Sequence, residues 1–296
     1  MRKSVMADFL MRAEYVKVKE LCQQDFKSRA VASAILEFAL VSLKYLLTQC
    51  QPIELVSKVS GKQYFTFGKA NTVARPVNKS LFLTDPNEVN TFWNRWVEDG
   101  LSSQDLAKLS YTIALSPCLA MEIFDRQNKK GPATFFECYI GHLFAKALDS
   151  NPTKRVRLPI NKRNILMTMD FLFDVPSTSQ KIHLPVKMST RERVVQAWAH
   201  QRLLDVAYGD EVFRGIMVLF SETKMDSRSL EVVEICVPDQ WLAYQSLLAK
   251  MDRIYYFDPP ERYLNLSEEN PEIIMVKQFS QFFTEKEVVL QKKHQG

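Results

Sequence analysis

The chain has 296 residues, of which 46% are hydrophobic and 11% aromatic. This length and apolar content suffice for one large domain or two modest ones with a full core, which excludes a disordered chain. Lys and Arg outnumber Asp and Glu by 39 to 34, so the net charge of +5 permits binding to a polyanion without requiring it.

The cysteines and the apolar runs bear on the cellular compartment. The 5 cysteines are scattered, and they lack the CxxC or Cys/His spacing of a zinc site. Charged residues interrupt the N-terminal region, and no apolar run reaches the ~18 residues of a membrane span. We therefore expect a cytoplasmic protein with reduced cysteines and no membrane partner.

The first part of the chain predicts mostly helices. Apolar residues recur at helical spacing over 3–49, and Asp85 followed by a proline predicts the first turn of another helix. Ser102 predicts the N-cap of a helix that runs toward Leu115. We expect this helix to end before Pro117, because proline lacks the N–H that a helix interior needs.

Two later segments place charge beside apolar residues. Residues 133–150 have the pattern of an amphipathic helix, with Glu137 at the edge of its apolar face, where a buried carboxylate needs a partner or a metal. We interpret the next segment either as a solvated loop and strand edge or as a phosphate contact beside an active site. It holds the densest basic run of the chain: Lys154, Arg155, Arg157, Lys162 and Arg163.

The central stretch, residues 165–205, carries the pattern that indicates chemistry. An apolar strand ends near Asp170, a second strand ends at Lys187, and a helix is predicted to open beside Ser189 and Thr190. Phosphodiester hydrolysis needs a carboxylate that holds a divalent cation and a positive group near the attacked phosphate. Asp170 and Lys187 supply both, although many α/β proteins carry such a pair by chance.

A run of three charged residues follows Lys187 closely. Arg191, Glu192 and Arg193 are predicted on the first turn of the helix, where two arginines oppose the helix dipole and so favour a ligand over ion pairs with solvent. Arg can donate two bonds to guanine and Glu can accept one from cytosine, so the tripeptide can read a GG:CC step. Gln196 lies on the same helical face and can contact an adjacent base or brace the arginines.

These residues together resemble a known family. Asp170, Pro185-Val186-Lys187 and the Lys-x-x-x-Arg-Glu-Arg run are similar to the PD-(D/E)XK type II restriction endonucleases that cut sites built on CCGG, CCNGG or CCWGG. The resemblance covers residues 131–221. It implies a Mg²⁺-dependent endonuclease in which Asp170, Lys187 and Glu137 are catalytic, Asp170 and Glu137 hold the metal, and the tripeptide reads the CC:GG dinucleotide.

The resemblance also implies a fold and a set of partners. We expect an α/β (α+β) chain with a mostly helical N-terminal region over 1–115, for DNA contact or dimerisation. A PD-(D/E)XK nuclease core over 116–296 should follow, with a central mixed sheet flanked by helices. The expected partners are double-stranded DNA, a second copy of the chain in a homodimer or higher homo-oligomer, and a cognate DNA methyltransferase in the same host.

The sequence departs from the family pattern at two places. Pro185 stands where an acid is usual, and the glutamate that this group carries in the following helix falls on His200 or Gln201. His200 can bind the metal or act as a base, although a lone helical histidine more often only packs. Otherwise the second metal ligand is lost, or another acid replaces it: Glu137, Asp205 or Glu192.

Three functions are open on the sequence alone. The first is a type II site-specific deoxyribonuclease that cuts a palindromic site containing CC:GG dinucleotides. The second is a sequence-specific DNA-binding protein or a degenerate nuclease of the same fold that does not cleave. The third is a nuclease of this fold that recognises DNA structure rather than sequence, in repair or transposition.

Overall fold

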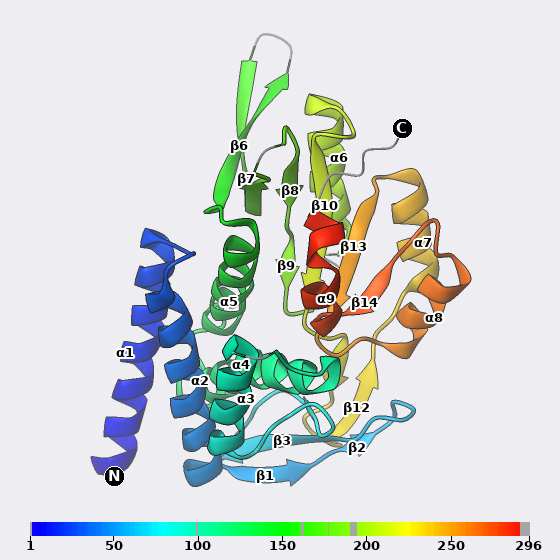
Figure 1. Ribbon diagram of the computed structural model, residues 1–296. Helices are drawn as coiled ribbons and strands as arrows, with labels where there is room; N and C mark the ends of the chain where they lie inside the picture. The colour runs from blue at the N-terminus through cyan, green and yellow to red at the C-terminus, as the bar shows by residue number, and fades with distance from the viewer. Residues whose placement is uncertain (1, 99, 161–162, 177, 190–193, 291–296) are drawn as a thin grey trace. The chain divides into compact units, whose positions relative to one another are not determined.

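The computed structural model forms two compact units, each described by itself below (Figure 1). Unit 1 comprises Met1–Tyr139 and Thr223–Ile235, and unit 2 comprises Ile140–Glu222 and Cys236–Gly296. The division rests on packing, so the functional domains predicted over 1–115 and 116–296 stay a prediction. The structure describes the following residues: 2–98, 100–160, 163–176, 178–189 and 194–290.

Helices make up most of unit 1. α1 (Arg2–Gln24) and α2 (Arg29–Gln49) pack together, as the helical spacing of their apolar residues predicts. Ser28 caps α2, because its hydroxyl oxygen accepts a hydrogen bond from Val31 N at 3.3 Å. α3 (Pro86–Glu98) begins at the predicted proline. Two small sheets in the described part of this unit contain β1 (Gln51–Glu54), β3 (Tyr64–Lys69), β4 (Thr72–Val73) and β5 (Val77–Asn78), and β2 (Val56–Ser57), β11 (Thr223–Met225) and β12 (Glu231–Glu234).

The fourth helix corrects one prediction. α4 (Ser103–Phe124) continues through Pro117, so the expected end before this proline is wrong. A proline inside a helix costs about 3 kcal/mol. Every residue from 109 to 121 is buried, and burying a single large apolar side chain contributes about 1.5–3 kcal/mol. The packing of the surrounding helix therefore outweighs the local cost of the proline.

One helix of unit 1 bears on the membrane question. In the described part of the chain, α2 alone combines the length and the apolar composition of a membrane span, with a mean hydropathy of 1.8 and 50% of that window buried. Its buried side chains contact α1 and α4. The core helix of a folded unit has the same composition, so this similarity is only weak support for a membrane span.

A mixed sheet forms the centre of unit 2. Its strand order within the described residues is β14-β13-β10-β8-β7-β6, with β9 paired to β10. β7 pairs antiparallel with β6 and β8, whereas β8, β9 and β13 run parallel to β10. The strands are β6 (Thr153–Ile160), β7 (Arg163–Asp174), β8 (Lys181–His183), β9 (Val186–Lys187), β10 (Phe213–Leu219), β13 (Met251–Tyr256) and β14 (Val276–Gln278).

Three helices cover one face of this sheet. α6 (Val194–Tyr208), α7 (Pro238–Leu247) and α8 (Glu261–Glu269) contribute Trp198, Trp241 and Tyr263 to a single cluster with Tyr256 of β13. The rings of Trp241 and Tyr263 stack at 4.1 Å. This cluster holds α6 against β10 and β13.

Two helices cover the opposite face. Successive strand residues point to opposite faces, so Tyr255 points away from the cluster that holds Tyr256. Its ring packs at 5.8 Å from Phe282 of α9 (Ser280–Leu290), which stacks at 4.4 Å on Phe144 of α5 (Gly131–Leu148). Figure 1 shows α9 in front of the sheet and α6 behind it. The predicted mixed sheet flanked by helices is confirmed.

Candidate active site

Asp170 and Lys187 lie on neighbouring strands of the unit 2 sheet. Leu172 of β7 pairs with His183 of β8, which places Asp170 opposite the segment that joins β8 to β9. In that segment the Leu184 N–H donates to the Phe171 carbonyl at 3.0 Å, whereas the Pro185 carbonyl accepts from Val218 N of β10, so the Pro185 position faces away from β7. The next donor that faces β7 is the Val186 N–H, and it donates to the Asp170 carboxylate instead.

The contacts of Asp170 are short and converge on one oxygen. Val186 N donates to Asp170 Oδ2 at 2.9 Å, and Lys187 Nζ donates to the same oxygen at 2.6 Å. Both side chains remain partly open, with 22% of the Asp170 side chain and 27% of the Lys187 side chain exposed. Solvent or a ligand can therefore reach this ion pair. The predicted acid and lysine are brought together as the sequence implies.

The donor atoms around Asp170 fit a hard divalent cation. The hydrogen bonds of Asp170 within the described residues end on Oδ2, which leaves Oδ1 for a cation. The Pro185 and Lys187 carbonyls bond to β10, so the intervening Val186 carbonyl faces β7 and Asp170, on the side of its own N–H. A carboxylate and a carbonyl oxygen are ligands that Mg²⁺ and Mn²⁺ accept. A cluster of three or more His, Cys, Asp or Glu ligands does not occur among the described residues.

The helix α6 contributes a buried polar network beside this pair. His183 Nδ1 donates to Gln201 Oε1 at 2.9 Å, and Gln201 Nε2 donates to Asp205 Oδ1 at 2.7 Å and to the Phe213 carbonyl at 2.6 Å. The Gln201 amide is therefore fully used inside the protein. Gly215 permits this approach of α6 to β10, because a Cβ there would lie 2.8 Å from Gln201 Oε1.

Burial controls the charge of the histidines in this region. It lowers the pKa of His183 to about 4, against a raising effect of the Gln201 hydrogen bond. It also lowers the pKa of His200, where the Asp170 carboxylate opposes the shift and the Lys187 ammonium adds to it. The two imidazole rings lie 6.3 Å apart. His200 is thus within electrostatic reach of both members of the Asp170–Lys187 pair.

Other predicted site residues are placed less completely. Gln196 is exposed on α6, and its DNA contact stays a prediction. The residues expected to read the CC:GG dinucleotide lie outside the described residues: Arg191, Glu192 and Arg193. Glu137 belongs to unit 1 and is half-buried on α5. Its charge contributes to raising the pKa of Tyr15, after burial and against a hydrogen bond from Thr134. Its role at the metal stays a prediction.

Two features were not predicted from the sequence. The Val186 amide and the His183–Gln201 network depend on which strands and helices meet, and neither has a motif. The only related indication in the sequence was that His200 and Gln201 stand where the family pattern has an acid. Asp205 was one possible replacement for that acid, and in the structure its carboxylate accepts from Gln201 while burial raises its pKa.

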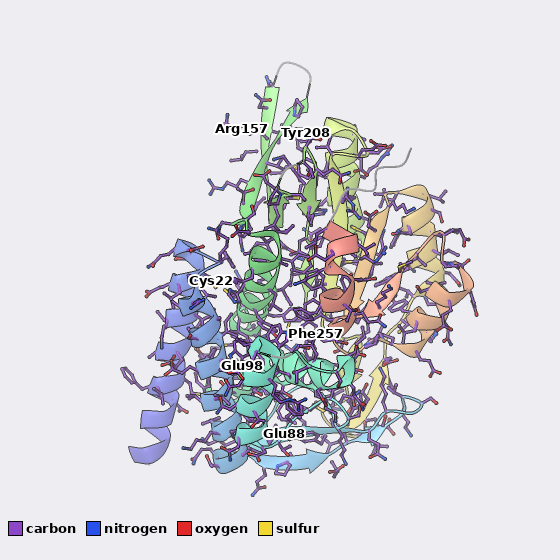
Figure 2. All side chains as sticks on the ribbon, viewed as in Figure 1. Cys22, Glu88, Glu98, Arg157, Tyr208 and Phe257 are labelled. Atoms are coloured by element: carbon purple, nitrogen blue, oxygen red, sulfur yellow. The ribbon has the colours of Figure 1, made fainter. Side chains whose placement is uncertain are left out.

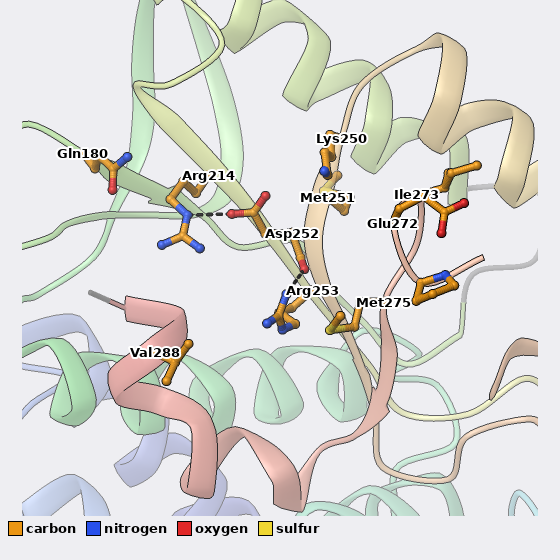
Figure 3. Close-up of a pocket in the computed structure, with 11 residues that line it drawn as sticks. Gln180, Arg214, Lys250, Met251, Asp252, Arg253, Glu272, Ile273, Met275 and Val288 are labelled. Atoms are coloured by element: carbon orange, nitrogen blue, oxygen red, sulfur yellow. Dashed lines mark hydrogen bonds and ion pairs between the residues drawn. The ribbon is translucent and has the colours of Figure 1, made fainter. Parts of the chain in front are cut away.

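A separate cavity of about 420 Å³ lies at the opposite end of β10 from Lys187 (Figure 3). Arg214 Nε donates to Asp252 Oδ2 at 2.6 Å, and Arg253 Nε donates to Glu285 Oε1 at 3.3 Å. Carboxylates thus offset the guanidinium charges that line or border it. Its volume alone does not make it the active site, because the predicted catalytic pair lies elsewhere.

The comparisons with known proteins bear on the fold. No family model and no curated protein sequence matches the chain. A complex of the restriction endonuclease PspGI with substrate DNA aligns with a TM-score of 0.42 and 16% identity over 70% of this chain and 93% of that one, which is only a distant similarity. The type IIP restriction endonuclease Kpn2I aligns with a TM-score of 0.80 and 22% identity over 95% of this chain and 97% of that one. The chain therefore has the fold of this type IIP restriction endonuclease.

Proposed function

We propose that the protein is a type II restriction endonuclease, a site-specific deoxyribonuclease that hydrolyses double-stranded DNA with Mg²⁺ at a palindromic site containing CC:GG dinucleotides. The observation that carries the proposal is the Asp170–Lys187 pair, joined at 2.6 Å on neighbouring strands and still partly exposed. Its support comes from the fold, which is that of Kpn2I. The sequence resemblance supplies the expected site class.

The chemistry follows from the charges of these residues. A divalent cation, when bound, lowers the pKa of water and offsets charge on the phosphate. Asp170 would hold it through Oδ1, with the Val186 carbonyl as a second oxygen ligand. The Lys187 ammonium, kept in place by Asp170 Oδ2, would stabilise the negative charge that develops as water attacks phosphorus and the bond to the leaving sugar oxygen breaks.

Recognition is assigned to residues 191–193 and to Gln196. Arg191, Glu192 and Arg193 would read the CC:GG bases in the major groove, and Gln196 would contact DNA from the exposed side of α6. The assignment rests on the sequence pattern. A restriction enzyme with this activity would act in the cytoplasm beside a cognate DNA methyltransferase that protects the host genome.

Plasmid digestion tests the proposal, and the chain offers a matched control. Asp174 and Lys181 form a second ion pair on β7 and β8, but at an exposed position. Asp170→Ala and Lys187→Ala should each lower the cleavage rate by about 10²-fold or more, the size found when a charge-stabilising group is removed. Asp174→Ala and Lys181→Ala should cleave like the unaltered protein. Equal activity in all four variants would refute the assignment, and sequencing the fragment ends would give the site.

A second function has one specific observation in its favour. The helical acid expected of the family is absent at His200 and Gln201, and the Gln201 amide is used internally. A DNA-binding protein without cleavage would retain a CC:GG-containing duplex intact with every divalent metal. DNA binding by the Arg191→Ala and Arg193→Ala variants distinguishes a protein that recognises a sequence, whether or not it cleaves, from a nuclease that recognises DNA structure. These substitutions should remove binding at one site, rather than weaken binding to all DNA equally.

A further inference from the structure

The position of His200 on α6 brings its ring to the Asp170 side of the helix. Leu204 of α6 packs with Leu172 of β7, so this part of the helix lies over the strand that carries Asp170. Gln201 fixes the rotation of α6, because its amide binds His183 and the Phe213 carbonyl. His200, the preceding residue, is half-buried, and the centre of its ring lies 6.3 Å from that of His183, which faces the same side of the sheet as Asp170.

The His200 ring is chemically ready to bind a cation. Within the described residues, no hydrogen bond occupies either of its ring nitrogens, in contrast to His183, whose Nδ1 is held by Gln201 at 2.9 Å. An imidazole nitrogen offers a lone pair to a metal ion. The oxygen donors at this place are Asp170 Oδ1 and the Val186 carbonyl. An imidazole beside them would complete a mixed set of oxygen and nitrogen ligands.

We propose that His200 is a nitrogen ligand of the divalent cation held by Asp170, and that the site consequently prefers Mn²⁺ or Co²⁺ to Mg²⁺. The inference rests on the proposed function, and it revises the expected cofactor rather than the reaction. Mg²⁺ takes oxygen ligands almost exclusively, whereas imidazole binds the later first-row ions more strongly. An all-oxygen site at the same place would favour Mg²⁺.

Electron spin-echo spectroscopy of bound Mn²⁺ tests the ligand directly. The unaltered protein should show nitrogen modulation from a coordinated imidazole, and selective ¹⁵N labelling of histidine should change that modulation. Asp170→Ala should abolish the bound Mn²⁺ signal. Failure of Mn²⁺ to bind, or Asp170-dependent binding without nitrogen modulation, would overturn the proposal, and neither result depends on a variant at His200 folding correctly.

Variants then test the metal preference. His200→Ala should lower Mn²⁺ affinity about tenfold or more in calorimetry and remove the nitrogen modulation. His200→Glu should restore binding through oxygen, without nitrogen modulation, and shift the affinity ratio toward Mg²⁺. Arg202→Ala, on an exposed part of the same helix, is the control and should change neither quantity. An unchanged Mn²⁺ to Mg²⁺ ratio in His200→Glu would contradict the proposal.

The inference and the proposed function fail in different ways. Cleavage supported by Mg²⁺ in a protein whose bound Mn²⁺ shows no nitrogen modulation would refute the His200 ligand and leave the endonuclease intact. Nitrogen modulation that depends on His200, in a protein that retains DNA without cutting it, would keep the metal site and refute the endonuclease.

Discussion

Gln201 acts in the structure as the residue that fixes α6 to the sheet. Its amide donates two hydrogen bonds and accepts one, all within the protein. We expect Gln201→Ala to lower the free energy of unfolding by about 2–4 kcal/mol, because it leaves buried polar groups without partners. Urea denaturation measures this loss. Gln196→Ala, at an exposed position of the same helix, should change stability by less than about 0.5 kcal/mol.

His183 makes stability depend on pH in a defined direction. Burial lowers its pKa in the folded protein to about 4, below the ordinary value near 6.5. Between these values the unfolded chain binds a proton that the folded chain does not, so stability falls as pH decreases through this range. The expected loss from pH 7.5 to 5 is about 2 kcal/mol from this residue.

Denaturation of the His183→Asn variant across that range measures the contribution. The variant keeps a donor for Gln201 but cannot titrate, so its stability should decline less steeply than that of the unaltered protein. The pKa of His200 is shifted in the same direction, so part of the decline should persist. Identical pH dependence in both proteins would show that His183 does not carry the effect.

At the scale of elements, part of the basic run of the sequence lies on β6, which pairs with β7. Arg155 and Arg157 point to the exposed face of β6, while Val156 and Leu158 are buried with Leu204 of α6. Tyr208 at the end of α6 donates its hydroxyl to the Arg157 carbonyl (Figure 2). The arginines are therefore presented on an edge strand that is anchored to α6, and they are open to a phosphate backbone.

Replacing both arginines should weaken binding to every DNA sequence alike. Each phosphate contact contributes about 0.9 to the slope of log affinity against log salt, so Arg155→Ala with Arg157→Ala should reduce that slope by about 2. Lys58→Ala, an exposed lysine of unit 1 that pairs with Glu231 at 3.3 Å, is the control and should leave the slope unchanged. A change confined to one DNA sequence would instead mean that the hairpin reads bases.

Elements with strong local signals could be predicted from the sequence, and those decided by packing could not. The proline that opens α3 marks the start of that helix correctly. Pro117 misled the prediction, because its local cost is small beside the burial around it. The helix α8 was missed, since its 9 residues have few buried positions.

At the scale of the whole molecule, the mixed sheet was implied by the family resemblance, and the neighbouring strands of Asp170 and Lys187 were indicated by the sequence pattern. The expected end of the first strand near Asp170 is wrong, because β7 continues to Asp174. The sequence pattern did not indicate the register of those strands. The bond from Val186 N depends on the register of β7 against β8, and the position of His200 depends on where α6 crosses the sheet. Sequence patterns indicate the local structure of each segment, but they do not show which side chains from distant segments come into contact.

A palindromic site requires a two-fold symmetric protein, so we expect the active form to be a homodimer. Sedimentation should give twice the mass of one chain, and a duplex with one site should bind two chains. Mixing the unaltered protein with an excess of Lys187→Ala should then produce dimers with one active site each. Such dimers cut one strand, so nicked circular plasmid should accumulate instead of linear DNA. If linear DNA still forms, at a rate reduced only in proportion to the fraction of unaltered protein, then one chain cuts both strands. The two-fold arrangement would then be wrong.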